Sequence, residues 1–368
     1  EGTGMIGRRG KLLIVVYMIF LVILFLMCST DLIIREPEKE VYQVAVIIED
    51  ARDDNYGNFR KGMDQAAVEF NADVRFITLY EEMDAGQQLD LIERERQDGA
   101  DALIVAPVDE KVLAAASGKQ GCAPMVLLGV REPEGRTEAV VVVNYRRMGE
   151  QLAEEMKKRI PAGCHVLILA EPHERSAAAE DFLQGAEAVL EDGGYDCRRV
   201  RPEGEEGYRE VIEALPEGKA VILAGTPETL SEAGGILEED PVLAGCVQGL
   251  YGRGSNMAAL NDLDSGIVTG ICVTDEFSRG YFSVQMAVEA LEKRGGREPL
   301  VMESYYIEKK DLRKSEYEKM LFPMELREEK EGAGTVDGGV RFSHGVSGAE
   351  GGGGEKIHSH RDQPLQGG

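Results

Sequence analysis

The polar and aromatic residues that could contact a ligand stand directly after short apolar segments that are typical of β-strands. In an open α/β sheet, ligands bind in the crevice beyond the carboxyl ends of the strands, where side chains can hydrogen-bond a solute or stack on its ring. Such residues recur in both halves of the chain, so we expect a ligand cleft between two halves. The strand ends are residues 50–56, 131, 144–147, 171–176, 225–228, 251–256 and 274–275.

No set of catalytic residues stands out from the sequence. It contains no G-x-S-x-G elbow, no phosphate-binding P-loop and no H-E-x-x-H zinc motif. The glycines of GLYGRG (249–254) are spaced wrongly for dinucleotide binding. His165 and His173 are the only histidines before residue 331, and the sequence indicates no Ser or Cys that would act with either of them as a nucleophile. We therefore expect no enzyme, no cofactor and no metal site.

The composition indicates a folded, acidic chain. Of 368 residues, 43% are hydrophobic, and 67 Asp and Glu against 41 Lys and Arg give a formal net charge of −26. Nucleic-acid binding depends on Lys and Arg that neutralise phosphates, so no nucleic-acid partner is expected. The six cysteines form no C-x-x-C pair, which argues against a zinc module or a disulfide scaffold.

An uncharged apolar run, LLIVVYMIFLVILFLM, occupies residues 12–27. At ~1.5 Å per residue, a helix over this run and the three residues after it just spans a hydrocarbon core of ~30 Å. A cleaved signal peptide is the alternative, but its apolar region is usually shorter and ends in small residues. Arg8, Arg9 and Lys11 precede the run and favour a cytoplasmic N-terminus. We expect residues 1–30 to be a cytoplasmic stub and a single-pass transmembrane anchor in the cell membrane, with the main domain on the extracytoplasmic side.

Between residues 41 and 312, β-branched runs alternate with amphipathic segments such as 58–70 and 149–160, a pattern typical of βαβ units and parallel sheets. The rhythm restarts near residue 139, which indicates two similar lobes. The strands are expected at 43–48, 74–79, 102–106, 125–129, 139–143, 166–170, 220–225, 245–249 and 266–273.

The predicted fold class is α/β, with two Rossmann-like lobes whose parallel sheets are joined by a hinge. We expect lobe 1 at about 41–130 and 276–298, and lobe 2 at about 138–273 and 300–312. The hinge segments are expected at 130–138, 273–276 and 297–301. Residues 331–368 include 12 glycines and few large apolar side chains, so we expect a disordered Gly-rich tail there.

Four segments resemble motifs of one family: DDNYGNFRKGMDQAA (53–67), DGADALIVAPVDE (98–110), VNYRRMGEQLAEEM (143–156) and VTDEFSRGYFSVQMAVEAL (273–291). Their order and separation are similar to those in the type I periplasmic sugar-binding proteins. This group includes ribose- and galactose-binding proteins and the ligand-binding half of LacI-type repressors. The resemblance implies the type I periplasmic-binding-protein fold, in which two lobes close on a solute and hinge segments absorb the change.

The resemblance also implies positions that contact the ligand. Rings of Tyr56, Phe182 and Tyr251 would stack on a sugar, while Asn144, Thr226 and Thr274 would hydrogen-bond its edge. Most charged sugar partners of the family are replaced here by neutral or aromatic residues. A simple aldose is therefore in doubt, and the alternative is a cleft that binds something less polar, or nothing. The full implied set is Asn55, Tyr56, Arg131, Asn144, Phe182, Thr226, Tyr251 and Thr274.

The leading functional hypothesis is a membrane-anchored, extracytoplasmic solute-binding protein that captures a small polar ligand, a carbohydrate or related metabolite, for the membrane permease of an ABC-type importer. A second hypothesis is a sensor whose closed form engages a membrane signalling protein such as a sensor kinase. A LacI-type regulator is a third, although it would need a basic DNA-binding module where this chain has an apolar span. An enzyme on this scaffold is the least supported.

Overall fold

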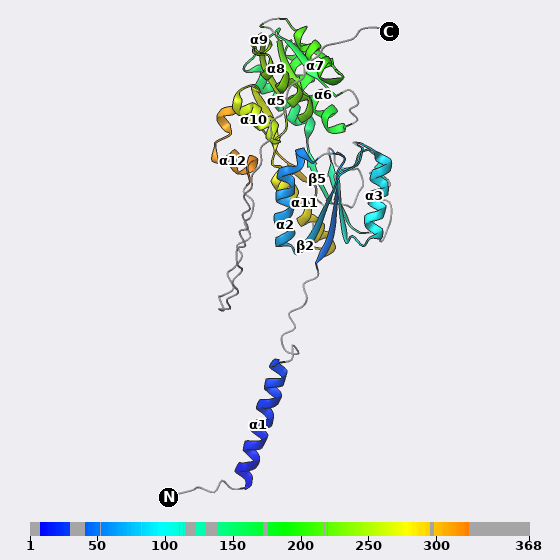
Figure 1. Ribbon diagram of the computed structural model, residues 1–368, viewed down its shortest axis with the longest axis vertical. Coiled ribbons are helices and arrows are strands. Elements are labelled where there is room, and N and C mark those ends of the chain that lie inside the picture. Colours follow the sequence, from blue (N-terminus) through cyan, green and yellow to red (C-terminus); the bar gives the residue numbers. More distant parts are fainter. Residues whose placement is uncertain are drawn as a thin grey trace, which may run out of the picture. The chain divides into compact units, whose positions relative to one another are not determined.

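The computed structural model describes most of the first 323 residues, and all structural statements below refer to the residues it describes. Residues 41–323 contain two α/β lobes, each built around one six-stranded sheet (Figure 1). The described ranges are 8–29, 41–51, 53–81, 83–109, 111–112, 114, 123–129, 139–171, 176–216, 218, 220–294 and 298–323. The Gly-rich segment expected to be disordered at 331–368 lies outside them.

Helix α1 spans Arg8–Ser29 and contains the whole apolar run of the N-terminal region. Its length and composition are sufficient to cross a membrane, a test that a signal sequence also passes. Its side chains from Leu12 to Leu26 are apolar on every side of the helix and are exposed. The predicted apolar N-terminal helix is therefore present.

The sheet of lobe 1 is entirely parallel, with the strand order β11-β5-β4-β3-β1-β2. Val44 and Val46 of β1 pack against α2 and α11, whereas Ala45 and Ile47 point to the opposite face and pack against α3. Helices therefore cover both faces, which explains why β1 is apolar at every position. The elements are β1 Tyr42–Ile47, η1 Asp54–Tyr56, α2 Gly57–Glu69, β2 Ala72–Ile77, α3 Ala85–Gln97, β3 Ala102–Val105, β4 Met125–Gly129, β5 Ala139–Val143, α11 Glu276–Leu291 and β11 Leu300–Met302.

The sheet of lobe 2 has the order β12-β10-β9-β8-β6-β7 and is parallel except for β12. Helices α5 and α6 cover one face, and α7, α8 and α10 cover the other. The elements are α5 Tyr145–Lys157, β6 His165–Leu169, α6 Ala177–Asp192, β7 Asp196–Val200, α7 Gly204–Glu213, β8 Ala220–Ala224, α8 Pro227–Glu239, α9 Pro241–Cys246, β9 Val247–Arg253, α10 Met257–Ser265, β10 Gly270–Thr274, β12 Ser304–Ile307, η2 Lys309–Asp311 and α12 Ser315–Leu321.

The chain crosses between the lobes at three points: from β5 to α5, from β10 to α11 and from β11 to β12. The structure therefore corrects the predicted boundaries. Strand β5 was expected in lobe 2, but it pairs with β4 in the sheet of lobe 1, and the first crossing follows Val143. Of the predicted hinge segments, 273–276 coincides with a crossing, 297–301 precedes the crossing at residues 302–304, and 130–138 lies outside the described residues.

Two strands of lobe 2 also differ from the sequence prediction. Strand β9 was expected at 245–249 but begins at Val247 and continues to Arg253. The glycines of GLYG look like a turn, yet Gly252 lies in the strand, where an added Cβ would be 3.0 Å from a methyl carbon of Leu230 in α8. Gly252 therefore lets α8 and the strand pack closely. Strand β10 begins four residues later than predicted, at Gly270.

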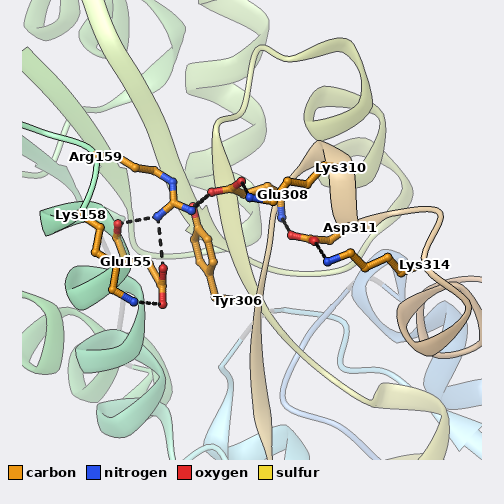
Figure 2. A network of polar contacts seen from close by, with 8 residues as sticks. All are labelled: Glu155, Lys158, Arg159, Tyr306, Glu308, Lys310, Asp311 and Lys314. Atoms are coloured by element: carbon orange, nitrogen blue, oxygen red, sulfur yellow. Dashed lines mark hydrogen bonds and ion pairs between the residues drawn. The ribbon is translucent and has the colours of Figure 1, made fainter.

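A network of ion pairs connects the C-terminal part of lobe 2 to the end of helix α5 (Figure 2). Arg159 contacts Glu308 of the segment after β12 and pairs with Glu155 at 3.2 Å, and its guanidinium lies 5.1 Å from the ring centre of Tyr306. The network continues through Lys310, Asp311 and Lys314. It holds in place the segment that leads into α12, whose Leu321 is buried in the core of lobe 2.

Candidate functional site

A cavity of about 450 Å³ lies at the carboxyl ends of strands from both lobes. Lobe 1 contributes residues that follow β1 and those of η1 and α11, and lobe 2 contributes residues that follow β6, β8 and β9. This is the position at which open α/β sheets bind ligands. The wall includes Glu49, Asp50, Asn55, Tyr56, Tyr145, Glu171, Ser176, Ala178, Thr226, Glu228, Arg253, Asn256, Cys272, Thr274 and Glu276.

Two carboxylates of lobe 1 are held by hydrogen bonds at the wall. The hydroxyl of Tyr56 donates to Glu49 at 3.0 Å, and burial raises the pKa of Glu49 above its ordinary value. Glu276 accepts a hydrogen bond from Thr274 at 2.5 Å and pairs with Arg279 at 3.0 Å. Arg279 itself is only 8% exposed. Both oxygens of Glu276 are therefore engaged within the protein.

Arg253 stands at the cavity wall of lobe 2, at the last position of β9. Its Nε donates to the carbonyl oxygen of Gly225 at 2.7 Å. Its guanidinium carbon lies 5.0 Å from the ring centre of Tyr145 and 5.6 Å from that of Phe182. One hydrogen bond and two aromatic rings thus fix the orientation of the guanidinium group.

The side chain of Asn55 makes two hydrogen bonds that join the lobes at the cavity. Nδ2 of Asn55, in η1 of lobe 1, donates to Oε1 of Glu228 in α8 of lobe 2 at 2.6 Å. Nδ2 of Asn256, which caps α10 of lobe 2, donates to Oδ1 of Asn55 at 2.9 Å. The amide of Asn55 therefore contacts lobe 2 through both its nitrogen and its oxygen.

Four of the residues predicted from the sequence line this cavity: Asn55, Tyr56, Thr226 and Thr274. Thr226 forms a capping box with Thr229 at the start of α8 and donates a hydrogen bond to Glu171 at 2.9 Å. Thr226 and Thr274 are nearly buried, with exposed fractions of 5% and 6%. Little of either side chain is thus exposed to a solute.

The structure places three other predicted residues away from the cavity wall. Asn144 accepts a hydrogen bond from the backbone of Arg147 at 2.9 Å and caps α5, so its side chain is engaged outside the cavity. Phe182 is fully buried, and Tyr251 is 1% exposed in the core beneath α5 and α6. Neither ring can stack on a ligand, although Phe182 packs against Arg253 from the core side. Arg131 lies outside the described residues.

Two wall residues, Tyr145 and Arg253, were missed by residue-by-residue transfer from the family. Side chains alternate between the two faces of a strand, so Tyr251 and Arg253 point to the same face, and Arg253 stands where the strand ends at the cavity. Tyr145 directly follows Asn144 at the first crossing between the lobes. Both residues belong to the strand-end segments 144–147 and 251–256. Position at the carboxyl end of a strand would therefore have identified them without the family alignment.

Cys272 also lines the cavity, and burial raises the pKa of its thiol, so this cysteine stays protonated and unreactive at neutral pH. Among the described residues, no group of three or more His, Cys, Asp or Glu side chains is arranged to hold a metal ion.

Two hinged α/β lobes with a polar cavity at their strand ends define the class of two-lobed solute-binding folds. The sequence profile described as "Periplasmic binding protein domain" matches residues 44–296, more than half of the chain. The chain therefore belongs to the periplasmic binding protein family. The resemblance to type I periplasmic sugar-binding proteins is confirmed.

Solved structures share the fold. An ABC transporter solute-binding protein from Actinobacillus succinogenes 130z with bound D-allose is 17% identical, with a TM-score of 0.62 over 73% of this chain and 98% of that chain. A carbohydrate transporter solute-binding protein from Agrobacterium radiobacter in complex with D-arabinose is 15% identical, with a TM-score of 0.67 over 76% and 99%. An ABC transporter solute-binding protein from Bacillus halodurans C-125 with bound myo-inositol is 19% identical, with a TM-score of 0.60 over 77% and 99%. No curated protein sequence matches the chain.

Proposed function

We propose that this protein captures a small polar solute, a carbohydrate or a related metabolite, in the cavity between its lobes. The observation that carries the proposal is the cavity itself, which is lined by hydroxyl, amide, carboxylate and guanidinium groups from the strand ends of both lobes. Its volume of about 450 Å³ lies within the range of roughly 300–1,000 Å³ that is usual for small-molecule pockets. The fold neighbours that carry D-allose, D-arabinose and myo-inositol support this ligand class.

The capture is a binding event coupled to lobe closure. A ligand that contacts both lobes stabilises the closed form, and a membrane partner that distinguishes closed from open then detects the bound state. We propose that this partner is the permease of an ABC-type importer, because the structural neighbours with bound D-allose and myo-inositol are ABC transporter solute-binding proteins.

The test is isothermal titration calorimetry of the full chain in detergent against monosaccharides, polyols, nucleosides and amino acids. We expect one carbohydrate-like class to bind, and Thr226→Ala to weaken that binding because it removes a hydroxyl at the wall. Ser265→Ala, an exposed change in α10, serves as the control. Absence of binding across the whole panel, or binding of nucleosides or amino acids alone, would contradict the proposal.

We further propose that α1 is retained as a membrane anchor with the two lobes outside the cytoplasm. The support is its length, its uninterrupted apolar composition and the basic residues at its start. After expression in a bacterial host, we expect the full chain to stay in the membrane fraction after a carbonate wash and to keep residues 8–29 by intact-mass analysis. Deletion of residues 8–29 should release the lobes into the soluble fraction. A soluble product that lacks α1 would show that the segment is a cleaved signal.

A further inference from the structure

Within the described part of the chain, Arg253 is the one cationic side chain on the cavity wall. Its Nε is bonded to Gly225 and its guanidinium lies near the rings of Tyr145 and Phe182. Its two terminal nitrogens form no hydrogen bond or ion pair with any residue that the structure describes. The hydroxyl of Tyr145, at the same wall, likewise forms no hydrogen bond with a described residue. Several donor groups therefore remain for a ligand on this side of the cavity.

Arg279 of lobe 1 shows the contrasting arrangement. Its guanidinium pairs with Glu276 at 3.0 Å, so its charge is balanced within the protein. A charged group that is partly removed from water is costly unless a counter-charge lies close to it. Among the described residues, no carboxylate lies within ion-pair distance of Arg253, so a carboxylate of the solute would give it a close counter-charge. A neutral hydroxyl can accept its hydrogen bonds but cannot balance its charge.

The geometry of Arg253 favours one anionic group. With Nε held by Gly225 and the guanidinium group fixed beside two rings, the two terminal nitrogens form a rigid pair of donors. Such a pair matches the two oxygens of a carboxylate, and bidentate bonds of this kind are stronger than those to neutral acceptors. Immobilising the guanidinium in advance reduces the entropy that binding would otherwise cost.

The start of helix α6 adds positive potential to the same wall. Ser176 and Ala178 line the cavity, and the side chain of Ser176, at the N-cap position, forms no capping hydrogen bond. The first backbone N–H groups of this 16-residue helix therefore carry their partial positive charge at the cavity without a side-chain cap. This second feature agrees with an acidic group on the ligand.

Four of the five acidic residues on the wall are bonded to protein groups. Glu276 is paired with Arg279, and Glu49 accepts a hydrogen bond from Tyr56. On lobe 2, Glu171 accepts a hydrogen bond from Thr226 and Glu228 accepts one from Asn55. These carboxylates are engaged with protein groups, whereas no described residue bonds the two terminal nitrogens of Arg253.

We propose that Arg253 binds a carboxylate of the ligand, and that the solute is a sugar acid of the uronate class. The inference rests on the proposed function, because it names the chemical class of solute for the same cavity. Hydroxyl groups of the sugar would meet the neutral wall residues Asn55, Thr226 and Thr274, and the carboxylate would lie against Arg253 and Tyr145.

The test is calorimetric titration of the full chain in detergent with matched pairs: D-galacturonate and D-galactose, and D-glucuronate and D-glucose. In at least one pair we expect the uronate to bind about 10- to 100-fold more tightly than its neutral partner. Arg253→Gln should abolish that preference, and Arg253→Lys should retain only part of it because the lysine ammonium cannot form the two parallel bonds. Arg198→Gln, an exposed change in β7 away from the cavity, should leave the preference intact.

The outcomes separate this inference from the proposed function. If the neutral sugar binds as tightly as its uronate, or if Arg253→Gln binds the uronate as the native chain does, the assignment of Arg253 is overturned while solute capture stands. If neither member of any pair binds, the inference fails, and the proposed function then depends on the wider panel. Circular dichroism of each variant checks that it is folded, and the Lys variant provides the test should the Gln variant not fold.

Discussion

Asn55 of lobe 1 and Glu228 of lobe 2 form a hydrogen bond of 2.6 Å across the cavity. The other side of the same amide accepts a hydrogen bond from Asn256 at 2.9 Å. The sequence predicted Asn55 as a ligand contact, which stays a prediction, and the structure shows that its side chain joins the lobes. We expect these two bonds to stabilise the arrangement in which the lobes are closed on the cavity.

Replacing Asn55 should weaken solute binding by destabilising closure. Asn55→Ala removes both interlobe hydrogen bonds, each with a net contribution of about 1 kcal/mol. We expect the dissociation constant to rise about 5- to 30-fold, because a smaller fraction of the protein is closed before binding. Titration calorimetry measures the change, with exposed Asp54→Ala of the same turn as control. An unchanged affinity for Asn55→Ala would show that the bridge does not contribute to closure.

Helix packing in lobe 2 depends on the absence of a side chain at Gly149. A Cβ added there would lie 1.9 Å from the carbonyl oxygen of Phe182, so α5 and α6 would have to move apart. We expect Gly149→Ala to lower the free energy of unfolding by about 1–3 kcal/mol. Gly235→Ala in α8 is the matched control, since a Cβ there meets no atom within 4 Å and alanine favours helix. Urea unfolding followed by circular dichroism should separate the two variants, and equal stability would contradict the close contact.

Burial of Glu49 predicts a pH dependence of stability with a definite sign. The pKa of Glu49 is raised in the folded protein above its ordinary value of 4.5 because burial disfavours the charged carboxylate. The folded state then binds more protons than the unfolded state above pH 4.5, so this contribution to stability decreases as the pH rises through the folded-state pKa. Glu49→Gln should therefore gain stability relative to the native chain as pH increases from 4.5 to 8. Urea unfolding over this range checks the sign, and a difference that is constant or reversed would contradict it.

The position of a strand was predictable from the sequence where a continuous apolar run matches a strand that is buried on both faces. Strand β5 at 139–143 has the bounds predicted from its run of valines, since strands covered on both faces are continuously apolar. The sheet to which β5 belongs was not predictable, because the local sequence of a parallel strand does not determine which strands it pairs with. Because β5 pairs with β4 in lobe 1, the first crossing between the lobes lies at residues 143–145 and not at 130–138, where it was expected from the sequence.

The site was predictable as strand ends but not as individual residues. Side chains two residues apart lie on the same face of a strand, so Tyr251 and Arg253 share one face of β9. The residue at the cavity is the one at the carboxyl end of the strand, so it can be identified only when the end of the strand is known. That end was misjudged because glycines within the strand look like a turn. At the start of α5 the residue predicted from the sequence was Asn144, which caps the helix, whereas the next residue, Tyr145, lines the cavity.

The most direct test of solute capture between the lobes is to fill the cavity. Ala178 lines the cavity at the start of α6, whereas its neighbour Ala177 is exposed and does not line it. The measurement is the affinity of the tightest-binding carbohydrate for the native chain, Ala178→Trp and Ala177→Trp, each by titration calorimetry. The account predicts that the indole of Ala178→Trp reduces affinity at least about tenfold by excluding the solute, while Ala177→Trp binds as the native chain does. Equal affinity of all three proteins would contradict it and place the solute elsewhere.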